Sequence, residues 1–170
     1  MIFMPWHGMN RVSVKVLPVP HFRQSPGLCG ASALQAVLAY WGKKHSEQEL
    51  ADLSHSNPDD GVEAPELLEA ARAVGFDGFY HDDAELDDLK RYLDLGLPVI
   101  VNWWSTNQGH FSVVVGMDDK HVYMVDPEKD RPFSRMPLDE FDGNWFDFKE
   151  PEQTDLTRRR LLVVAPHKLV

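Results

Sequence analysis

The stretch Gln24-Ser-Pro-Gly-Leu-Cys29-Gly30-Ala31-Ser32, with the apolar run Ala33-Leu-Gln-Ala-Val-Leu-Ala-Tyr-Trp41 behind it, decides the fold of this chain. The apolar positions lie nearly all round the helix that the run predicts, so we expect a central, buried helix over residues 30–41. Gly42 ends that helix. The only cysteine of the chain, Cys29, stands at its first turn. The positive end of the helix dipole favours a thiolate there, which points to a nucleophile.

The composition fits one compact domain. The chain has 170 residues, 43% of them hydrophobic, which is enough for a proper core. A single cysteine excludes an intramolecular disulfide and suits a reducing compartment, so we expect a cytoplasmic protein. A net charge of −10 argues against nucleic-acid binding, because a phosphate backbone needs a positive surface. The apolar start lacks a basic region and is interrupted by Pro5 and His7, so we expect neither a signal peptide nor a membrane span.

The order of the predicted elements indicates an α+β fold, with helices in the first half and strands in the second. We expect residues 1–10 to be ragged or disordered, with Met4 and Met9 as alternative starts, and residues 11–170 to form one domain. The elements expected are a half-buried strand over 11–17, helices over 30–41, 46–53, 65–74 and 83–95, and strands over 97–101, 111–115, 121–125 and 161–164. The basic run 158–160 is expected to be a solvated strand end.

A cysteine hydrolase also needs a base, a group that orients the base, and donors for the oxyanion. His110 is the best candidate base, because it stands at the entry of the strand over 111–115. Asp126 ends the next strand, and an antiparallel hairpin would bring it beside His110, where it can accept the Nδ1 proton. Gln24, on the loop leading into Cys29, is the candidate oxyanion donor. Gly30 is expected to leave room for a substrate backbone.

These residues carry a resemblance to a known family. Gln24, Cys29-Gly-Ala-Ser-Ala-Leu34, the strand Leu97–Val101, His110-Phe-Ser-Val-Val-Val115 and Asp126-Pro127 follow one another as in the C39-like peptidases, a papain-like branch that includes the double-glycine leader peptidases. The resemblance covers roughly residues 17 to 148. It implies an N-terminal helical half, with a central nucleophile-bearing helix, packed on a C-terminal antiparallel sheet. It also implies Cys29 as nucleophile, His110 as base, Asp126 as orienter and Gln24 in the oxyanion hole.

Two departures from the family concern the substrate. We expect no transporter segment or membrane span, so a coupled cut-and-export role is not carried over. Asn102-Trp103-Trp104 stands where many relatives have a His or a smaller residue. Trp103 and Trp104 are candidates for the wall of a peptide groove, although aromatic residues carry much of the core burial in a domain of this size.

The leading hypothesis is therefore a cysteine peptidase that cuts a peptide or isopeptide bond of a peptide or protein substrate through a Cys29 thioester. An acyltransferase or amidase with the same residues is the first alternative, and a non-catalytic peptide-binding module is the second. We expect no cofactor and no metal, because His81-Asp82-Asp83 is too local for a closed site. The run Asp126-Pro-Glu-Lys-Asp130 lacks the glycine and terminal glutamate of a calcium loop.

Overall fold

The structure, a computed structural model, describes residues 14–149 and 155–167. The expectation for residues 1–10 lies outside the described residues. The helices are α1 (Cys29–Tyr40), α2 (Glu47–Leu53), α3 (Ala64–Ala73), α4 (Leu86–Asp94) and α5 (Leu138–Asn144). The strands are β1 (Asp77–His81), β2 (Val99–Ser105), β3 (Gln108–Met117), β4 (His121–Val125), β5 (Ser134–Pro137), β6 (Phe146–Lys149), β7 (Asp155–Arg158) and β8 (Leu161–Ala165). The α+β expectation is confirmed.

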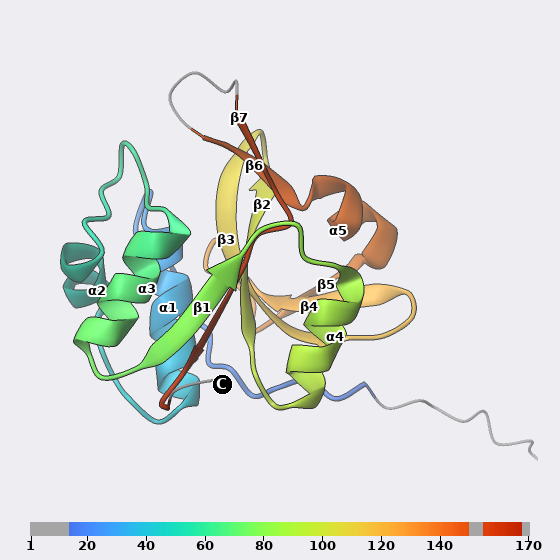
Figure 1. The fold of residues 1–170 in the computed structure, drawn as a ribbon, viewed down its shortest axis with the longest axis horizontal. Helices are drawn as coiled ribbons and strands as arrows, with labels where there is room; N and C mark the ends of the chain where they lie inside the picture. The colour runs from blue at the N-terminus through green and yellow to red at the C-terminus, as the bar shows by residue number, and fades with distance from the viewer. Residues whose placement is uncertain (1–13, 150–154, 168–170) are drawn as a thin grey trace, which may run out of the picture.

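A six-stranded antiparallel sheet in the order β1-β8-β2-β3-β4-β5 forms the centre of the molecule. A separate pair, β6 and β7, completes the strands of the described residues. Figure 1 shows α1, α2 and α3 gathered on one side of the central strands and α4 and α5 on the other. Because both faces are covered, β8 is buried along its whole length, as its continuous apolar sequence requires.

The central helix forms as its sequence predicts. Eight of the twelve residues of α1 are buried, and the helix packs against β3. Gly42 follows it at a φ of 84°, a backbone conformation that glycine adopts without strain. Gly27, before the helix, has a φ of 75°, and a Cβ there would lie 2.5 Å from the Cα of Pro58. The loop that carries Cys29 is therefore pressed against the loop that precedes α3.

The hairpin of β2 and β3 extends further than expected. A loop was expected over residues 105–109, but the strands pair up to Ser105 and Gln108. The two residues between them, Thr106 and Asn107, both have positive φ values of 52° and 64°. Two positive φ values in a two-residue turn match the twist of the flanking strands. His110 consequently lies within β3, paired with Trp103, rather than at its entry.

Three further expectations are corrected. Residues 14–17 of the expected N-terminal strand form no strand, although the Leu17 N–H donates to the Val115 carbonyl, which a register shift in β3 leaves available. The first half of the chain also supplies a strand, β1, which pairs with β8. Arg160 is not a solvated strand end: it is 7% exposed, and its guanidinium donates to both carboxylate oxygens of Asp82 and to Glu63. A buried guanidinium needs such partners.

Candidate active site

Cys29 is the first residue of α1 and is partly exposed. The preceding residue, Leu28, provides no side-chain cap, so the first N–H groups of the helix are left for other partners. Beneath the thiol, Gly30 is buried, and a Cβ at that position would lie 2.4 Å from Val62 and 3.3 Å from Phe111. The glycine therefore permits close packing of the helix start. The side chains of Val62 and Phe111 occupy the space beside it, where room for a substrate backbone was expected.

His110 and Asp126 come together across β3 and β4. The pairing of Val113 with Val125, continued by one residue, sets Asp126 opposite Ser112 and diagonal to His110. The imidazole Nε2 donates to the Asp126 Oδ1 at 2.6 Å, and both side chains are 2% exposed. The expectation that Nδ1 faces Asp126 is wrong. The edge of Trp103 packs against the ring at a centroid distance of 6.0 Å, and the orientation adopted leaves Nδ1 for the thiol.

The electrostatics of this pair favour an imidazolium. Burial lowers the pKa of His110, but hydrogen bonds to Asp126 and Cys29 and the charges of both outweigh it and raise the pKa to about 10. Burial likewise raises the pKa of Asp126, but the hydrogen bond and charge of His110 lower it below its usual value. The ring therefore keeps both protons at neutral pH. A protonated imidazole beside a thiol favours a thiolate–imidazolium pair.

A clamp formed by residues 21–24 holds the turn that carries Asp126. Three successive carbonyls of this turn accept hydrogen bonds from the clamp. His21 Nε2 donates to the Asp126 carbonyl at 3.0 Å, the Gln24 N–H donates to that of Pro127 at 2.9 Å, and Arg23 donates to that of Glu128. The segment that bears the candidate oxyanion residue is thus tied to the segment that bears the candidate orienter.

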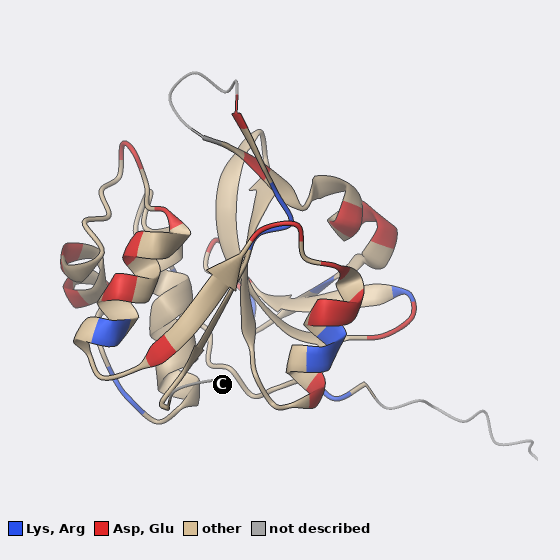
Figure 2. Cartoon of the chain, in the orientation of Figure 1, with Lys and Arg blue, Asp and Glu red and all other residues tan. Residues whose placement is uncertain are grey.

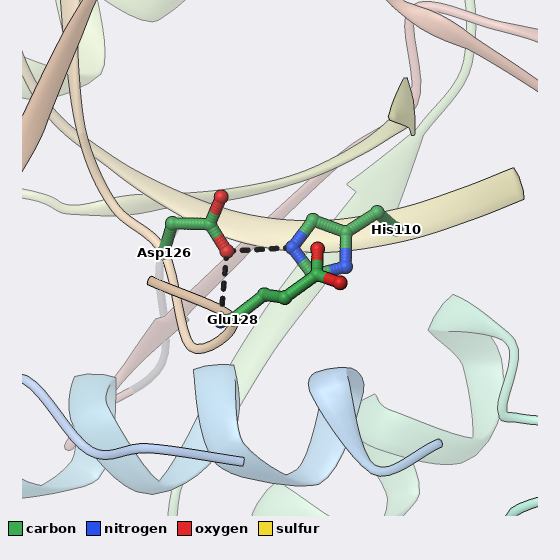
Figure 3. A group of neighbouring side chains, drawn as sticks. All are labelled: His110, Asp126 and Glu128. Atoms are coloured by element: carbon green, nitrogen blue, oxygen red, sulfur yellow. Dashed lines mark hydrogen bonds and ion pairs between the residues drawn. The ribbon is translucent and has the colours of Figure 1, made fainter. Parts of the chain in front are cut away.

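Glu128 joins this group and was not anticipated from the sequence. Its N–H donates to the Asp126 Oδ1 at 3.0 Å, and its side chain extends toward the His110 ring (Figure 3). One ligand atom from each of His110, Asp126 and Glu128 lies within 4.8 Å of the others, so the set could hold a metal ion. An ion bound through the ring would require a deprotonated nitrogen, whereas the raised pKa of His110 favours the protonated ring. The position of Glu128 beside this pair could have been found from the sequence, because Glu128 follows Asp126 by two residues in a turn.

The exposed side of Cys29 opens into a cavity of about 460 Å³ that His110 and Gln24 also line. The Oε1 atom of Gln24 is buried and has no hydrogen-bond partner among the described residues, so an acceptor is left for a donor on a bound group. A role toward an oxyanion would use the Nε2 hydrogens of the same amide. A larger cavity of about 570 Å³ lies elsewhere, between α4 and the β3–β4 turn, and no Cys, Ser or Thr is among its described lining residues. The chemistry of the side chains marks the smaller cavity as the candidate active site.

The residues expected to bind substrate lie elsewhere. Trp103 is 5% exposed, and its indole N–H donates to Ser112 at 3.0 Å. Trp104 packs against Phe146 and Phe148. Both tryptophans line a different cavity, of about 350 Å³, on the Asp126 side of the histidine. In the structure these side chains pack beside the site, and Trp103 contacts the His110 ring at an interplanar angle of 65°.

Comparison with known proteins agrees with this geometry. Residues 22–148 match the model of the Peptidase C39 family. No curated protein matches the chain. Among the helices of the described residues, none has both the length and the apolar character required to span a membrane.

Solved structures of similar fold cover most of the chain. The peptidase domain of Streptococcus ComA, a bifunctional ABC transporter of a quorum-sensing pathway, is 24% identical over 88% of this chain and 99% of that one, with a TM-score of 0.71. A double-glycine motif protease from an AMS/PCAT transporter, solved with its leader peptide, is 28% identical over 89% and 94%, with a TM-score of 0.69. A protein assigned as a C39-like peptidase from Bacillus anthracis is 18% identical over 92% and 100%, with a TM-score of 0.68.

Proposed function

The chain belongs to the Peptidase C39 family, and from that premise we propose that residues 11–170 form a single cysteine peptidase domain with Cys29 as nucleophile, His110 as proton donor and acceptor, Asp126 as orienter and Gln24 in the oxyanion hole. The observation that supports this most strongly is that His110 contacts both other side chains. Its Nε2 lies 2.6 Å from the Asp126 Oδ1, and its hydrogen bonds to Asp126 and Cys29 raise its pKa. A single cysteine that must stay reduced suits a reducing compartment such as the cytoplasm.

The reaction follows from the division of the two ring nitrogens of His110. Nε2 is held by Asp126, which leaves Nδ1 facing the thiolate of Cys29. The sulfur attacks the scissile carbonyl carbon, and the resulting oxyanion accepts hydrogen bonds from the Cys29 N–H and the Gln24 amide. The imidazolium gives its Nδ1 proton to the departing amine, and a thioester remains. Water then loses a proton to Nδ1, attacks the thioester and releases the acid.

The substrate that we propose is a peptide with two glycines before the scissile bond, because a double-glycine motif protease of similar fold has been solved in complex with its leader peptide. Incubation with such a synthetic peptide should release two fragments, and Cys29→Ala should abolish release while keeping the unfolding midpoint. Mass spectrometry of the quenched reaction should find an acyl group on Cys29. Release of fragments by Cys29→Ala at the wild-type rate would contradict the proposal.

Acyl transfer is the second candidate, because the same thioester can pass its acyl group to an amine instead of to water. When hydroxylamine is added at low concentration, the acyl product of the wild type should still be mainly the free acid. A product that is mainly the hydroxamate even at a low hydroxylamine concentration would instead assign the chain as an acyltransferase. Addition of EDTA should leave the rate unchanged, since no step uses the His110–Asp126–Glu128 group as a metal centre.

A further inference from the structure

Apart from Cys29 and His110, the ionisable side chains in the walls of the Cys29 cavity are all acidic. These acidic residues are Asp59, Asp60, Glu63 and Asp147, and no Lys or Arg lines the cavity within the described residues. Figure 2 shows the acidic residues on the loop between α2 and α3, with no basic residue on that loop. Low-dielectric walls concentrate the field of such charges inside a cleft. The walls of the cavity therefore carry more negative charge than the single imidazolium of His110 offsets.

The four carboxylates are not equally compensated. Glu63 accepts a hydrogen bond of 2.8 Å from Arg160, and Asp147 accepts one from the Phe148 N–H. Asp59 and Asp60 take part in no ion pair among residues 14–149 and 155–167. The negative charge at this rim therefore comes mainly from these two exposed aspartates.

The loop that bears the two aspartates is fixed in place next to the nucleophile. The Asn57 side-chain oxygen accepts from the Asp59 N–H at 3.0 Å and from the Asp60 N–H at 2.8 Å. The Asn57 and Gly61 backbones also bond to each other in both directions. The next residue, Pro58, is pressed against Gly27 of the Cys29 loop. The backbone that bears both carboxylates is thus held beside the Cys29 loop before any substrate arrives.

We propose that the peptide cut at this site carries a Lys or Arg side chain beside the scissile bond, held by Asp59 and Asp60, and that an acidic residue at that position is rejected. The inference rests on the proposed function, since it names the substrate class of the same cavity. A cationic side chain gains from both carboxylates, while a carboxylate meets like charge and finds no Lys or Arg in the described lining to receive it. Discrimination of this kind weakens with salt, because the two aspartates are exposed.

A first test measures the field at the sulfur without any substrate. Cys29 is the only cysteine, so methanethiosulfonate reagents modify a single atom: the thiolate displaces sulfinate and a mixed disulfide forms. Relative to free cysteine, we expect the trimethylammonium-ethyl reagent to outpace the sulfonato-ethyl reagent by about 10-fold at low salt. Asp59→Asn with Asp60→Asn should reduce that ratio several-fold. The matched control, Asp87→Asn with Asp119→Asn, removes the same charge from exposed positions outside the cavity and should leave the ratio unchanged.

A second test uses double-glycine peptides that differ only in the residue directly after the bond, or in the third residue before it: Lys, Gln or Glu. In at least one of the two sets, kcat/KM should fall in the order Lys, Gln, Glu. The Asp59/Asp60 double variant should show smaller differences in kcat/KM between the three peptides. Equal rates for all peptides, or a reagent ratio equal to that of free cysteine, would overturn the inference while fragment release upheld the proposed function. A reagent ratio that rises on addition of EDTA would assign the aspartates to a bound divalent cation and also overturn it. Absence of both fragments and acyl-enzyme would instead refute the proposed function, and the inference with it.

Discussion

His110 divides its two ring nitrogens between two partners, and this division predicts how Asp126 variants behave. Asp126 both orients the ring through Nε2 and contributes the charge that raises the pKa of His110. The Glu128 N–H donates to the same oxygen, so an amide at this position would keep its oxygen toward the ring. Orientation and charge can therefore be separated by two substitutions.

Asp126→Ala should lower kcat by about 100-fold or more, because the ring loses both orientation and charge. Asp126→Asn should lower kcat by less than about 10-fold, since it keeps the acceptor and loses only the charge. The loss of charge should move the alkaline limb of the pH profile to lower pH. Steady-state kinetics from pH 5 to 11 would measure both effects, and equal loss in the two variants would contradict the separate roles.

The protonation of His110 sets a second expectation at this scale. Hydrolysis needs the imidazolium proton, so kcat should fall as pH rises through about 10, the pKa of His110. Alkylation of Cys29 needs only the thiolate and should show no such decline. If both rates fell together, the limb would report unfolding or another group rather than the loss of the proton donor.

Among the elements, α1 is the part that sequence predicts best and Gly30 is its most constrained position. A Cβ at Gly30 would lie 2.4 Å from Val62 and within 3.3 Å of Leu67 and Phe111. Gly30→Ala should therefore destabilise the protein by about 1–3 kcal/mol through overpacking. Gly143→Ala in α5 is the matched control, because no atom lies within 4 Å of its added Cβ. It should be neutral or slightly stabilising in chemical denaturation, and equal effects would contradict the packing argument.

The clamp of residues 21–24 gives a further prediction at the element scale. His21→Ala removes the donor to the Asp126 carbonyl and should lower kcat by about 2- to 10-fold, the effect of one hydrogen bond, with little change in KM. His21→Gln retains a donor and should recover much of the loss. A change confined to KM, or no recovery by glutamine, would mean that His21 does not position the turn.

The contrast between predicted and unpredicted elements has a physical cause. The helix at Cys29 is predictable because its apolar run and its glycine stop are local signals. The hairpin argument likewise pairs β3 with β4 and predicts that His110 meets Asp126. β1 is not predictable in this way, because a five-residue strand depends on pairing with β8, more than 75 residues distant. The ring orientation of His110 depends on packing against Trp103, which no sequence pattern specifies.

At the scale of the whole molecule, Arg160 ties the end of β7–β8 to Glu63, at the start of α3 and in the wall of the cavity. Arg160→Met keeps most of the side-chain volume but loses three charge-assisted hydrogen bonds, so it should cost about 1–3 kcal/mol of unfolding free energy. The exposed Arg158→Met should change stability by less than about 0.5 kcal/mol. Denaturant unfolding followed by tryptophan fluorescence measures both, and similar values would contradict a structural role for the buried guanidinium.

The His110–Asp126 pair also makes stability depend on pH. Because folding raises the pKa of His110 from 6.5 to about 10, its contribution is full below pH 6.5 and is lost as pH rises through about 10. Folding lowers the pKa of Asp126 from 3.8, so its contribution is present above pH 3.8 and is lost as pH falls further. The stability difference between wild type and His110→Gln should thus be greatest near pH 5–6 and shrink toward pH 10. A difference constant with pH would contradict the charged pair.

The measurement that tests the central claim most directly is the pH dependence of Cys29 alkylation by iodoacetamide, followed by intact mass, in the wild type and in His110→Ala. The account predicts that the wild type is alkylated much faster than the variant at pH 6, and that the two rates converge at alkaline pH, where the thiolate no longer depends on the imidazolium. Superimposed profiles for the two proteins would show that His110 does not activate the sulfur, and would contradict the thiolate–imidazolium pair.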